Sequence, residues 1–270
     1  MLTDEMRERL GQLAGRGAPG PPFLPPAAPS RRAEEGRRVV LPAGCEVENE
    51  HGRHWLVESP LEAVCRGAAG LFSDRARNRR PASSAHAELL ALAQHMPRSV
   101  AFLDLETCGL AGAPIFLVGL VHHGPHGLVL AQLLARDYTE EQAVLHAFWQ
   151  RTADKAVLAS FNGKSFDWPT LQDRTAWHGL PARPPASRVH CDMLHHARRR
   201  WKGQLPDYRL QTLERYVCGR CRAGDIPGRE IPRAYHQFVR SGDGTQIRAI
   251  LHHNALDLVT LLQLAAALLQ

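Results

Sequence analysis

The stretch Phe102-Leu103-Asp104-Leu105-Glu106-Thr107 decides the fold class of this chain. Side chains two residues apart on a β-strand project to the same face, so this apolar run places Asp104 and Glu106 side by side. Two adjacent carboxylates repel each other unless a cation lies between them, and hard divalent cations prefer oxygen ligands. The stretch therefore predicts a strand that carries part of a metal site, and it indicates a metal-dependent hydrolase.

The sequence around this strand predicts an α/β domain over residues 97–270. Three apolar runs joined by glycine-containing turns are typical of consecutive strands, at 100–106, 115–122 and 128–134. After these strands, patterns typical of helices and of buried strands follow one another, and the last predicted element is a long C-terminal helix. The further expected elements are helices at 139–151, from about 168, at 192–201, 210–218, 232–240 and 245–269, and strands at 157–161 and 188–191. Three meander strands followed by helices and two further strands favour a mixed sheet flanked by helices.

The chain before this domain divides into two parts. Residues 1–36 are rich in Pro, Ala and Gly, and they hold too few apolar side chains to offset the entropy cost of ordering. We therefore expect a disordered tail after a short helix at 4–14. Residues 37–96 are expected to form a small region that contains a β-hairpin within 44–64.

The second half of this small region has its own pattern. Residues 75–80 hold several arginines and are expected to form a basic linker. A helix is expected over 85–95, with Ser83 or Ser84 as its N-terminal cap.

Composition limits the possible partners. The net charge of +6 and the pI near 9.3 suit a polyanion such as nucleic acid, although an arginine-rich proteome would give the same balance. No apolar stretch reaches about 18 residues, so we expect no membrane span. The N-terminus lacks the apolar core of a secretory signal, and we expect a cytoplasmic protein.

Cysteine usage gives one weaker signal. Six cysteines in a cytoplasmic chain argue against a disulfide framework. Only Cys218 and Cys221 have the spacing of zinc ligands, and no second pair of cysteines exists to complete a site. These two residues are therefore interpreted first as ordinary thiols, with a zinc site completed by nearby His or Cys residues as the alternative.

Two further blocks carry acidic residues at the ends of expected elements. Asn162-Gly-Lys-Ser-Phe-Asp167 follows an apolar run, and His252-His253-Asn-Ala-Leu-Asp257 lies on the last expected helix. A single acidic residue at a strand end is often a helix cap or a solvated turn residue. Three blocks in this order are better explained by one site in which four carboxylates converge.

The three blocks resemble the DEDD exonuclease superfamily, whose members share the ribonuclease-H-like fold. The resemblance is closest to the YprB-type proteins, which are generally described as predicted exonucleases. Phe-Leu-Asp-Leu-Glu-Thr, Asn-Gly-Lys-Ser-Phe-Asp-Trp-Pro, Asp225-Ile-Pro-Gly-Arg-Glu-Ile-Pro232 and His-Asn-x-x-Asp all look like that group, over about residues 98–265.

This resemblance implies phosphodiester hydrolysis of DNA or RNA with two Mg²⁺ or Mn²⁺ ions. By the same resemblance, Asp104 would bridge both ions, Glu106 and Asp257 would hold one, and Asp167 would hold the other. A histidine would accept a proton from the attacking water.

Two histidines compete for this role. In one branch of the family the base lies five residues before the last Asp, at the position of His252, and in the other branch it lies four before, at His253. On a continuous helix His253 faces the same way as Asp257, whereas His252 is rotated by about 140°. We therefore favour His253, and a helix that begins later would favour His252.

The neighbouring polar residues have weaker assignments. Thr107, Asn162 and Lys164 are candidate substrate-binding residues. Asp192 is expected first to cap the helix that follows it, with a supporting catalytic role as the alternative.

Three functions remain open from the sequence. The first is a metal-dependent 3′-to-5′ exonuclease, and the second is a structure-specific endonuclease on the same site. The third is a nucleic-acid-binding module with little turnover, which would agree with the arginine excess.

Overall fold

The computed structural model describes residues 41–71, 86–110, 112–181 and 188–270. The expected tail at 1–36, its helix at 4–14 and the basic linker at 75–80 lie outside these residues. None of the helices in these ranges combines the length and the apolar composition that a membrane span requires.

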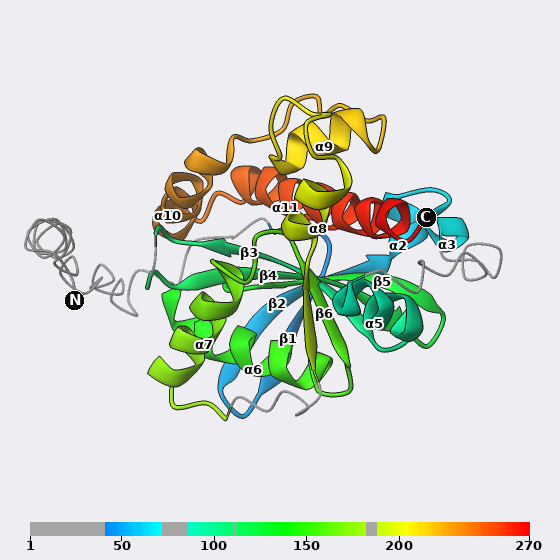
Figure 1. Cartoon of the computed structure of the whole chain (residues 1–270). Coiled ribbons are helices and arrows are strands. Elements are labelled where there is room, and N and C mark those ends of the chain that lie inside the picture. Colours follow the sequence, from blue (N-terminus) through cyan, green and yellow to red (C-terminus); the bar gives the residue numbers. More distant parts are fainter. Residues whose placement is uncertain (1–40, 72–85, 111, 182–187) are drawn as a thin grey trace, which may run out of the picture.

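A single mixed sheet organises the fold (Figure 1). Its seven strands lie in the order β1-β2-β5-β4-β3-β6-β7. All neighbouring pairs up to β3 are antiparallel, whereas β3–β6 and β6–β7 are parallel. The strands span β1 Cys45–Asn49, β2 Gly52–Pro60, β3 Val100–Thr107, β4 Ile115–Gly124, β5 Gly127–Leu134, β6 Val157–Ser160 and β7 Val189–Asp192.

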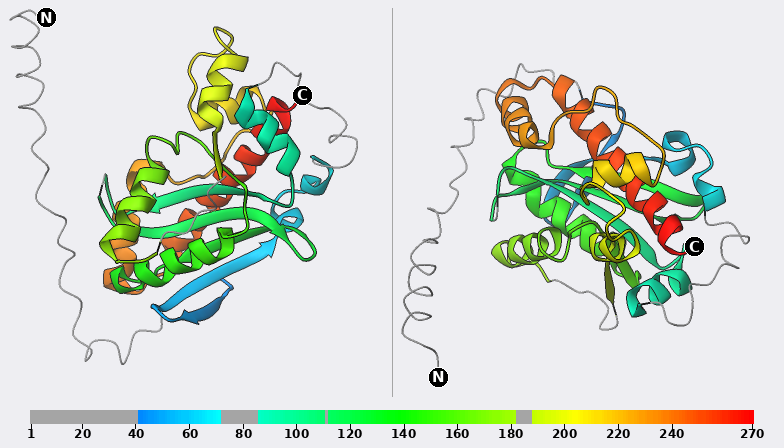
Figure 2. Two further views of the ribbon diagram at one scale, coloured as in Figure 1. Left: turned by 60° about the horizontal axis from the view of Figure 1, so that its bottom comes forward. Right: turned by 45° about the horizontal axis from the view of Figure 1, so that its top comes forward.

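Helices cover both faces of the sheet. The long helix α11 crosses one face above β3 and β4, while α6 packs on the other face against β2 and β4 (Figures 1 and 2). The described helices are α2 Leu61–Val64, α3 Ala68–Leu71, α5 Ala87–His95, α6 Glu141–Thr152, α7 Asp167–Trp177, α8 Met193–Arg200, α9 Leu210–Tyr216, α10 Ile231–Ser241 and α11 Thr245–Leu268. Two short 3₁₀ helices, Tyr138–Glu140 and Gly228–Glu230, precede α6 and α10.

Most expected elements are present within one or two residues of their predicted bounds. The antiparallel meander of β3, β4 and β5 is confirmed, as are the two later strands. The hairpin of β1 and β2 is also present, and β2 pairs with β5, so the hairpin extends the same sheet. The sequence did not predict that pairing.

The expected cap of the 85–95 helix is wrong. Helix α5 begins at Ala87, and its N-cap is His86, whose Nδ1 accepts a hydrogen bond from the backbone N–H of Glu88. Because an imidazole nitrogen can accept a hydrogen bond as a serine hydroxyl does, the helix begins after the histidine.

Strand β3 shows how the sheet presents the candidate site side chains Asp104 and Glu106. Leu103 and Leu105 are buried toward one side, and Asp104 and Glu106 alternate with them and are only partly buried. This period of two is the one expected from strand geometry, and it directs both carboxylates to the same face.

Candidate active site

Four carboxylates from three elements meet beside the middle of the sheet. Asp104 and Glu106 lie on β3, Asp167 is the first residue of α7, and Asp257 lies on α11. The charges of Glu106, Asp167 and Asp257 all act on Asp104. The sequence places these residues far apart, and the fold brings them together.

The electrostatics of this acidic pocket are unfavourable when no cation is bound. Burial raises the pKa of Asp104 well above its usual range, and the charges of Asp257, Glu106 and Asp167 raise it further. Burial, Asp257 and Asp167 also raise the pKa of Glu106. Burial and the nearby Asp192 raise the pKa of Asp167 to about 7. Buried carboxylates that repel one another are the donor set that hard divalent cations neutralise, so these residues fit Mg²⁺ or Mn²⁺.

A chain of amides holds the carboxylate of Asp104 in place. Asn254 Nδ2 donates to Asp104 Oδ2 at 2.8 Å, and Gln132 Nε2 donates to Asn254 Oδ1 at 2.9 Å. Both amide side chains are almost fully buried. Hydrogen bonds in such a setting fix orientation because the alternative is an unsatisfied buried polar group.

Gly119 makes room for this chain of amides. It pairs with Asp104 on one side and with Gln132 on the other, so the three residues lie level across three strands. A Cβ added at Gly119 would lie 2.1 Å from Asn254 Oδ1. Only a residue without a side chain therefore allows Asn254 to reach the sheet.

The two candidate histidines, His252 and His253, differ in burial and in their contacts. Helix α11 is continuous through both, His253 is buried, and His252 is exposed. His253 Nε2 lies 3.5 Å from Asp257 Oδ2, and its Nδ1 lies 2.9 Å from Asp225 Oδ2. Asp225 therefore orients the ring, and the second nitrogen faces the acidic pocket.

A buried arginine partly neutralises the pocket. Arg222 forms a hydrogen-bonded ion pair with Asp257, and it also donates to Glu214 at 2.7 Å and to Asp225 at 3.1 Å. The Arg222 and Glu214 side chains are only 6% and 1% exposed. Although burial raises the pKa of Asp257, the positive charge of Arg222 acts against that shift.

Hydrogen bonds to the carboxylate of Asp192 fix the loop before α7. This fully buried carboxylate accepts hydrogen bonds from the backbone N–H groups of Asn162 at 2.9 Å and Lys164 at 3.2 Å. It also accepts from the N–H of Leu194 at 3.0 Å, which confirms the expected helix cap. Asn162 adopts a φ of 60°, a left-handed conformation that Asn tolerates.

The candidate substrate-binding side chains make contacts within the protein. Lys164 Nζ lies 2.6 Å from Glu88 Oε1, so its charge already has a partner. Thr107 is largely buried, and its hydroxyl donates to the carbonyl of Gly109 at 2.7 Å. A role in substrate binding stays a prediction for Thr107, Asn162 and Lys164.

Cys218 and Cys221 were interpreted first as ordinary thiols, and no contact in the described residues indicates a metal site at them. In the described part of the chain, neither cysteine belongs to a group of three or more His, Cys, Asp or Glu ligands. Cys218 is partly buried and Cys221 is exposed.

Sequence reasoning missed Arg222, and it assigned no function to Asp225 or Asn254. Asp225 opens the block Asp225-Ile-Pro-Gly-Arg-Glu-Ile-Pro232, and Asn254 lies inside the His-Asn-x-x-Asp block. Both were thus within recognised motifs, and only the fold shows which atoms they contact. Arg222 lies in an irregular segment that no pattern distinguishes.

Comparison with known proteins identifies the superfamily of this chain. Residues 101–269 match the family model of the RNase_H superfamily, and the chain therefore belongs to this superfamily. It is 34% identical over 168 residues to the uncharacterized protein YprB of Bacillus subtilis (strain 168). That match covers 60% of this chain and 40% of the relative, so the chain spans less than half of the relative's length. The expected YprB-type, ribonuclease-H-like character is confirmed.

A solved structure shows the same fold at lower identity. The family B DNA polymerase from the hyperthermophilic archaeon Pyrobaculum calidifontis matches with a TM-score of 0.51 and 18% identity. The match covers 63% of this chain and 24% of the polymerase chain. At this identity the likeness concerns the fold alone.

Proposed function

We propose that this protein is a metal-dependent nuclease that hydrolyses phosphodiester bonds of nucleic acid, acting as a 3′-to-5′ exonuclease. The observation that carries the proposal is the meeting of Asp104, Glu106, Asp167 and Asp257 in one pocket, where their charges raise one another's pKa. A structural role such as helix capping requires no such gathering of like charges. Membership of the RNase_H superfamily supports the same conclusion.

The acidic pocket would hold two divalent ions, Mg²⁺ or Mn²⁺, through these four carboxylates. When bound, such ions supply electrophilic stabilisation of the phosphate and activation of the attacking water. The amide of Asn254 keeps Asp104 turned toward the pocket. Because Asp192 holds the backbone before α7, Asp167 enters the pocket from a fixed direction.

His253 would serve as the proton acceptor at Nε2. Its Nδ1–H donates to the carboxylate of Asp225, which leaves Nε2 on the side of Asp257. An imidazole suits this task because it exchanges protons near neutral pH. Asp225 is then a positioning residue that acts through the histidine.

One observation favours a second function, a nucleic-acid-binding module with little turnover. The guanidinium of Arg222 already forms an ion pair with Asp257, and it would compete with a cation for that carboxylate. In such a protein, nucleic acid would bind equally well with and without divalent ions.

A substrate panel tests the proposal. Single- and double-stranded DNA and RNA, labelled at either end, are incubated with the full chain and Mg²⁺ or Mn²⁺. We expect 5′-labelled strands to shorten progressively and 3′-labelled strands to release labelled mononucleotide. A circular single strand should stay intact, because an exonuclease needs an end, and its cleavage would instead indicate an endonuclease.

Matched variants assign the activity to the pocket. Asp104→Asn and Asp257→Asn should abolish cleavage, whereas Asp173→Asn, at an exposed position on α7, should leave it unchanged. Absence of cleavage on every substrate, or full activity in Asp104→Asn, would reject the nuclease. Metal-independent binding of nucleic acid by such an inactive protein would support the binding module.

A further inference from the structure

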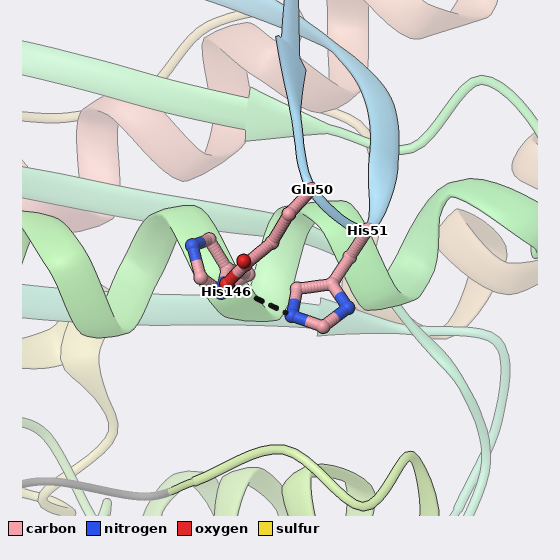
Figure 3. A group of neighbouring side chains, drawn as sticks. All are labelled: Glu50, His51 and His146. Carbon is pink, nitrogen blue, oxygen red and sulfur yellow. Dashed lines mark ion pairs between the residues drawn. The ribbon is translucent and has the colours of Figure 1, made fainter.

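A second group of metal-ligand side chains lies where the N-terminal hairpin meets helix α6. The turn between β1 and β2 supplies Glu50 and His51, and α6 supplies His146 (Figure 3). Glu50 Oε1 lies 3.4 Å from His51 Nε2 and 3.6 Å from His146 Nδ1. All three ligand atoms lie within 4.8 Å of one another.

These distances suit a tetrahedral transition-metal site. Ligands about 2.0–2.1 Å from a zinc ion are roughly 3.3–3.4 Å apart at tetrahedral angles. The two distances from Glu50 are close to that edge length. Two imidazoles and one carboxylate are a common ligand set for Zn²⁺, and the exposed Glu50 side chain leaves a fourth position open to water.

The hairpin turn is fixed against the helix by its neighbours. Asn49 Nδ2 donates to the backbone carbonyl of Ala143 in α6 at 3.0 Å, and Asn49 Oδ1 accepts from the N–H of His51 at 2.9 Å. The turn therefore rests on α6 without any ion, and the two histidine rings lie with their centroids 4.7 Å apart.

Gln142 completes the surroundings of the site. Its side-chain amide lies 3.3 Å from His51 Nδ1, one helical turn before His146. A metal at His51 Nε2 requires the proton of the neutral imidazole on Nδ1. The Gln142 side chain would then accept from that N–H with its oxygen, and the 3.4 Å hydrogen bond from Gln142 Nε2 to the carbonyl of His178 would be lost. Such outer partners orient ligating histidines in known metal sites.

Another cluster of possible metal ligands in the described chain, formed by His86, Glu88 and His196, is a weaker candidate for a metal site. Its carboxylate already pairs with Lys164 at 2.6 Å and with His196 at 3.0 Å. A cation there would have to displace an ammonium group. Glu50 has no lysine or arginine within ion-pair distance among the described residues.

We propose that Glu50, His51 and His146 form a binding site for a transition-metal ion, with zinc as the ion that fits best. The bound ion would join the β1–β2 turn to α6 and so clamp the outer hairpin onto the domain. His146 lies on α6 and Asp257 of the acidic pocket lies on α11, and these two helices cover opposite faces of the sheet (Figure 1). The hairpin precedes residues 101–269, whereas His146 lies within them, so the ion would join the segment that matches the family model to the region before it.

Zinc titration of the full chain tests the proposal. Calorimetry is performed with Zn²⁺ in excess Mg²⁺, so that the acidic pocket does not contribute. We expect one zinc equivalent to bind, the melting temperature to rise, and amide exchange in β1 and β2 to slow. X-ray absorption of the zinc-loaded protein should show two imidazole ligands.

Variants locate the ion. Glu50→Gln and His146→Ala should each weaken zinc binding at least about tenfold and abolish the rise in melting temperature. Because Glu50 is exposed in a turn, Glu50→Gln tests the site even if His146→Ala disturbs α6. His126→Ala, at an exposed turn, is the matched control and should bind as the wild type does.

Two outcomes would overturn the proposal. The first is unchanged zinc affinity in both Glu50→Gln and His146→Ala. The second is loss of binding in His86→Ala with binding intact in Glu50→Gln, which would place the ion at the other cluster.

Discussion

The imidazole of His253 is held by Asp225, whose Oδ2 lies 2.9 Å from its Nδ1 although the two residues are 28 positions apart. The ring therefore has one nitrogen fixed by a carboxylate and the other on the side of Asp257. His252, its neighbour in the chain, is exposed. Adjacent histidines of the same helix thus have different surroundings.

The first prediction concerns this difference. His253→Ala should lower the single-turnover cleavage rate about 10²–10⁴-fold, the usual contribution of a general base. His252→Ala is the matched control and should cleave at nearly the wild-type rate. A larger loss in His252→Ala than in His253→Ala would contradict the assignment.

The second prediction concerns Asp225. Asp225→Asn keeps the shape of the side chain but removes the charge that orients His253. We expect kcat to fall, by no more than His253→Ala lowers the rate, with little change in KM. Steady-state kinetics on an end-labelled strand measure both constants. An effect confined to KM would assign Asp225 to substrate binding instead.

The third prediction concerns Arg222, which lies between Asp257 and Glu214. Arg222→Met leaves these buried carboxylates without their partner, and the free energy of unfolding should fall by about 3–5 kcal/mol. The control is Arg53→Met, because Arg53 pairs with Glu46 on the surface and its side chain is 58% exposed. That change should cost less than about 1 kcal/mol. Urea unfolding compares the two, and equal losses would contradict a special role for the buried pair.

The fourth prediction concerns pH and metal removal. Because burial and Asp192 raise the pKa of Asp167 from 3.8 to about 7, the folded metal-free protein binds a proton more tightly than the unfolded chain. This group therefore favours folding at low pH, and its contribution is lost as pH rises from about 4 through 7.

Asp167→Asn should remove this pH dependence. In EDTA at pH 8 the variant should be more stable than the wild type, and at pH 4 the two should be similar. Adding Mg²⁺ or Mn²⁺ should stabilise the wild type more than the variant. Thermal unfolding across this pH range measures the difference, and equal stability at pH 8 in EDTA would contradict the electrostatic account.

The fifth prediction concerns Gly119. Gly119→Ala places a Cβ 2.1 Å from Asn254 Oδ1, so Asn254 must move and Asp104 loses its donor. We expect a destabilisation of about 1–3 kcal/mol, as for other overpacked cores, together with loss of cleavage. Gly228→Ala has open space around its Cβ and should be neutral in both assays. Full activity in Gly119→Ala would show that Asn254 does not position Asp104.

The sequence predicted the elements that carry local periodicity. In β3, the alternation of apolar and acidic residues predicts the face of the sheet to which the Asp104 side chain points. In α11, the helical pattern places His253 one turn before Asp257. These signals depend on residues within a few positions of one another, and a single sequence contains them.

The remaining features depend on contacts between distant segments. Arg222 reaches Asp257 across 35 positions, and Gln132 reaches Asn254 across 122. The pairing of β2 with β5 is of the same kind. Local sequence propensities do not predict such contacts, because the residues next to each partner in the sequence do not distinguish it from other polar or apolar positions.

The hairpin of β1 and β2 forms one edge of the sheet, next to β5. Outer strands expose unpaired peptide groups that can recruit strands of other molecules, and charged side chains oppose this. Glu46 and Glu48 give β1 such charges, whereas β5, which the hairpin covers, has the apolar sequence Gly-Leu-Val-Leu-Ala-Gln-Leu-Leu. A chain shortened to begin after Pro60 would uncover that row of peptide groups, and it would be expected to self-associate into aggregates.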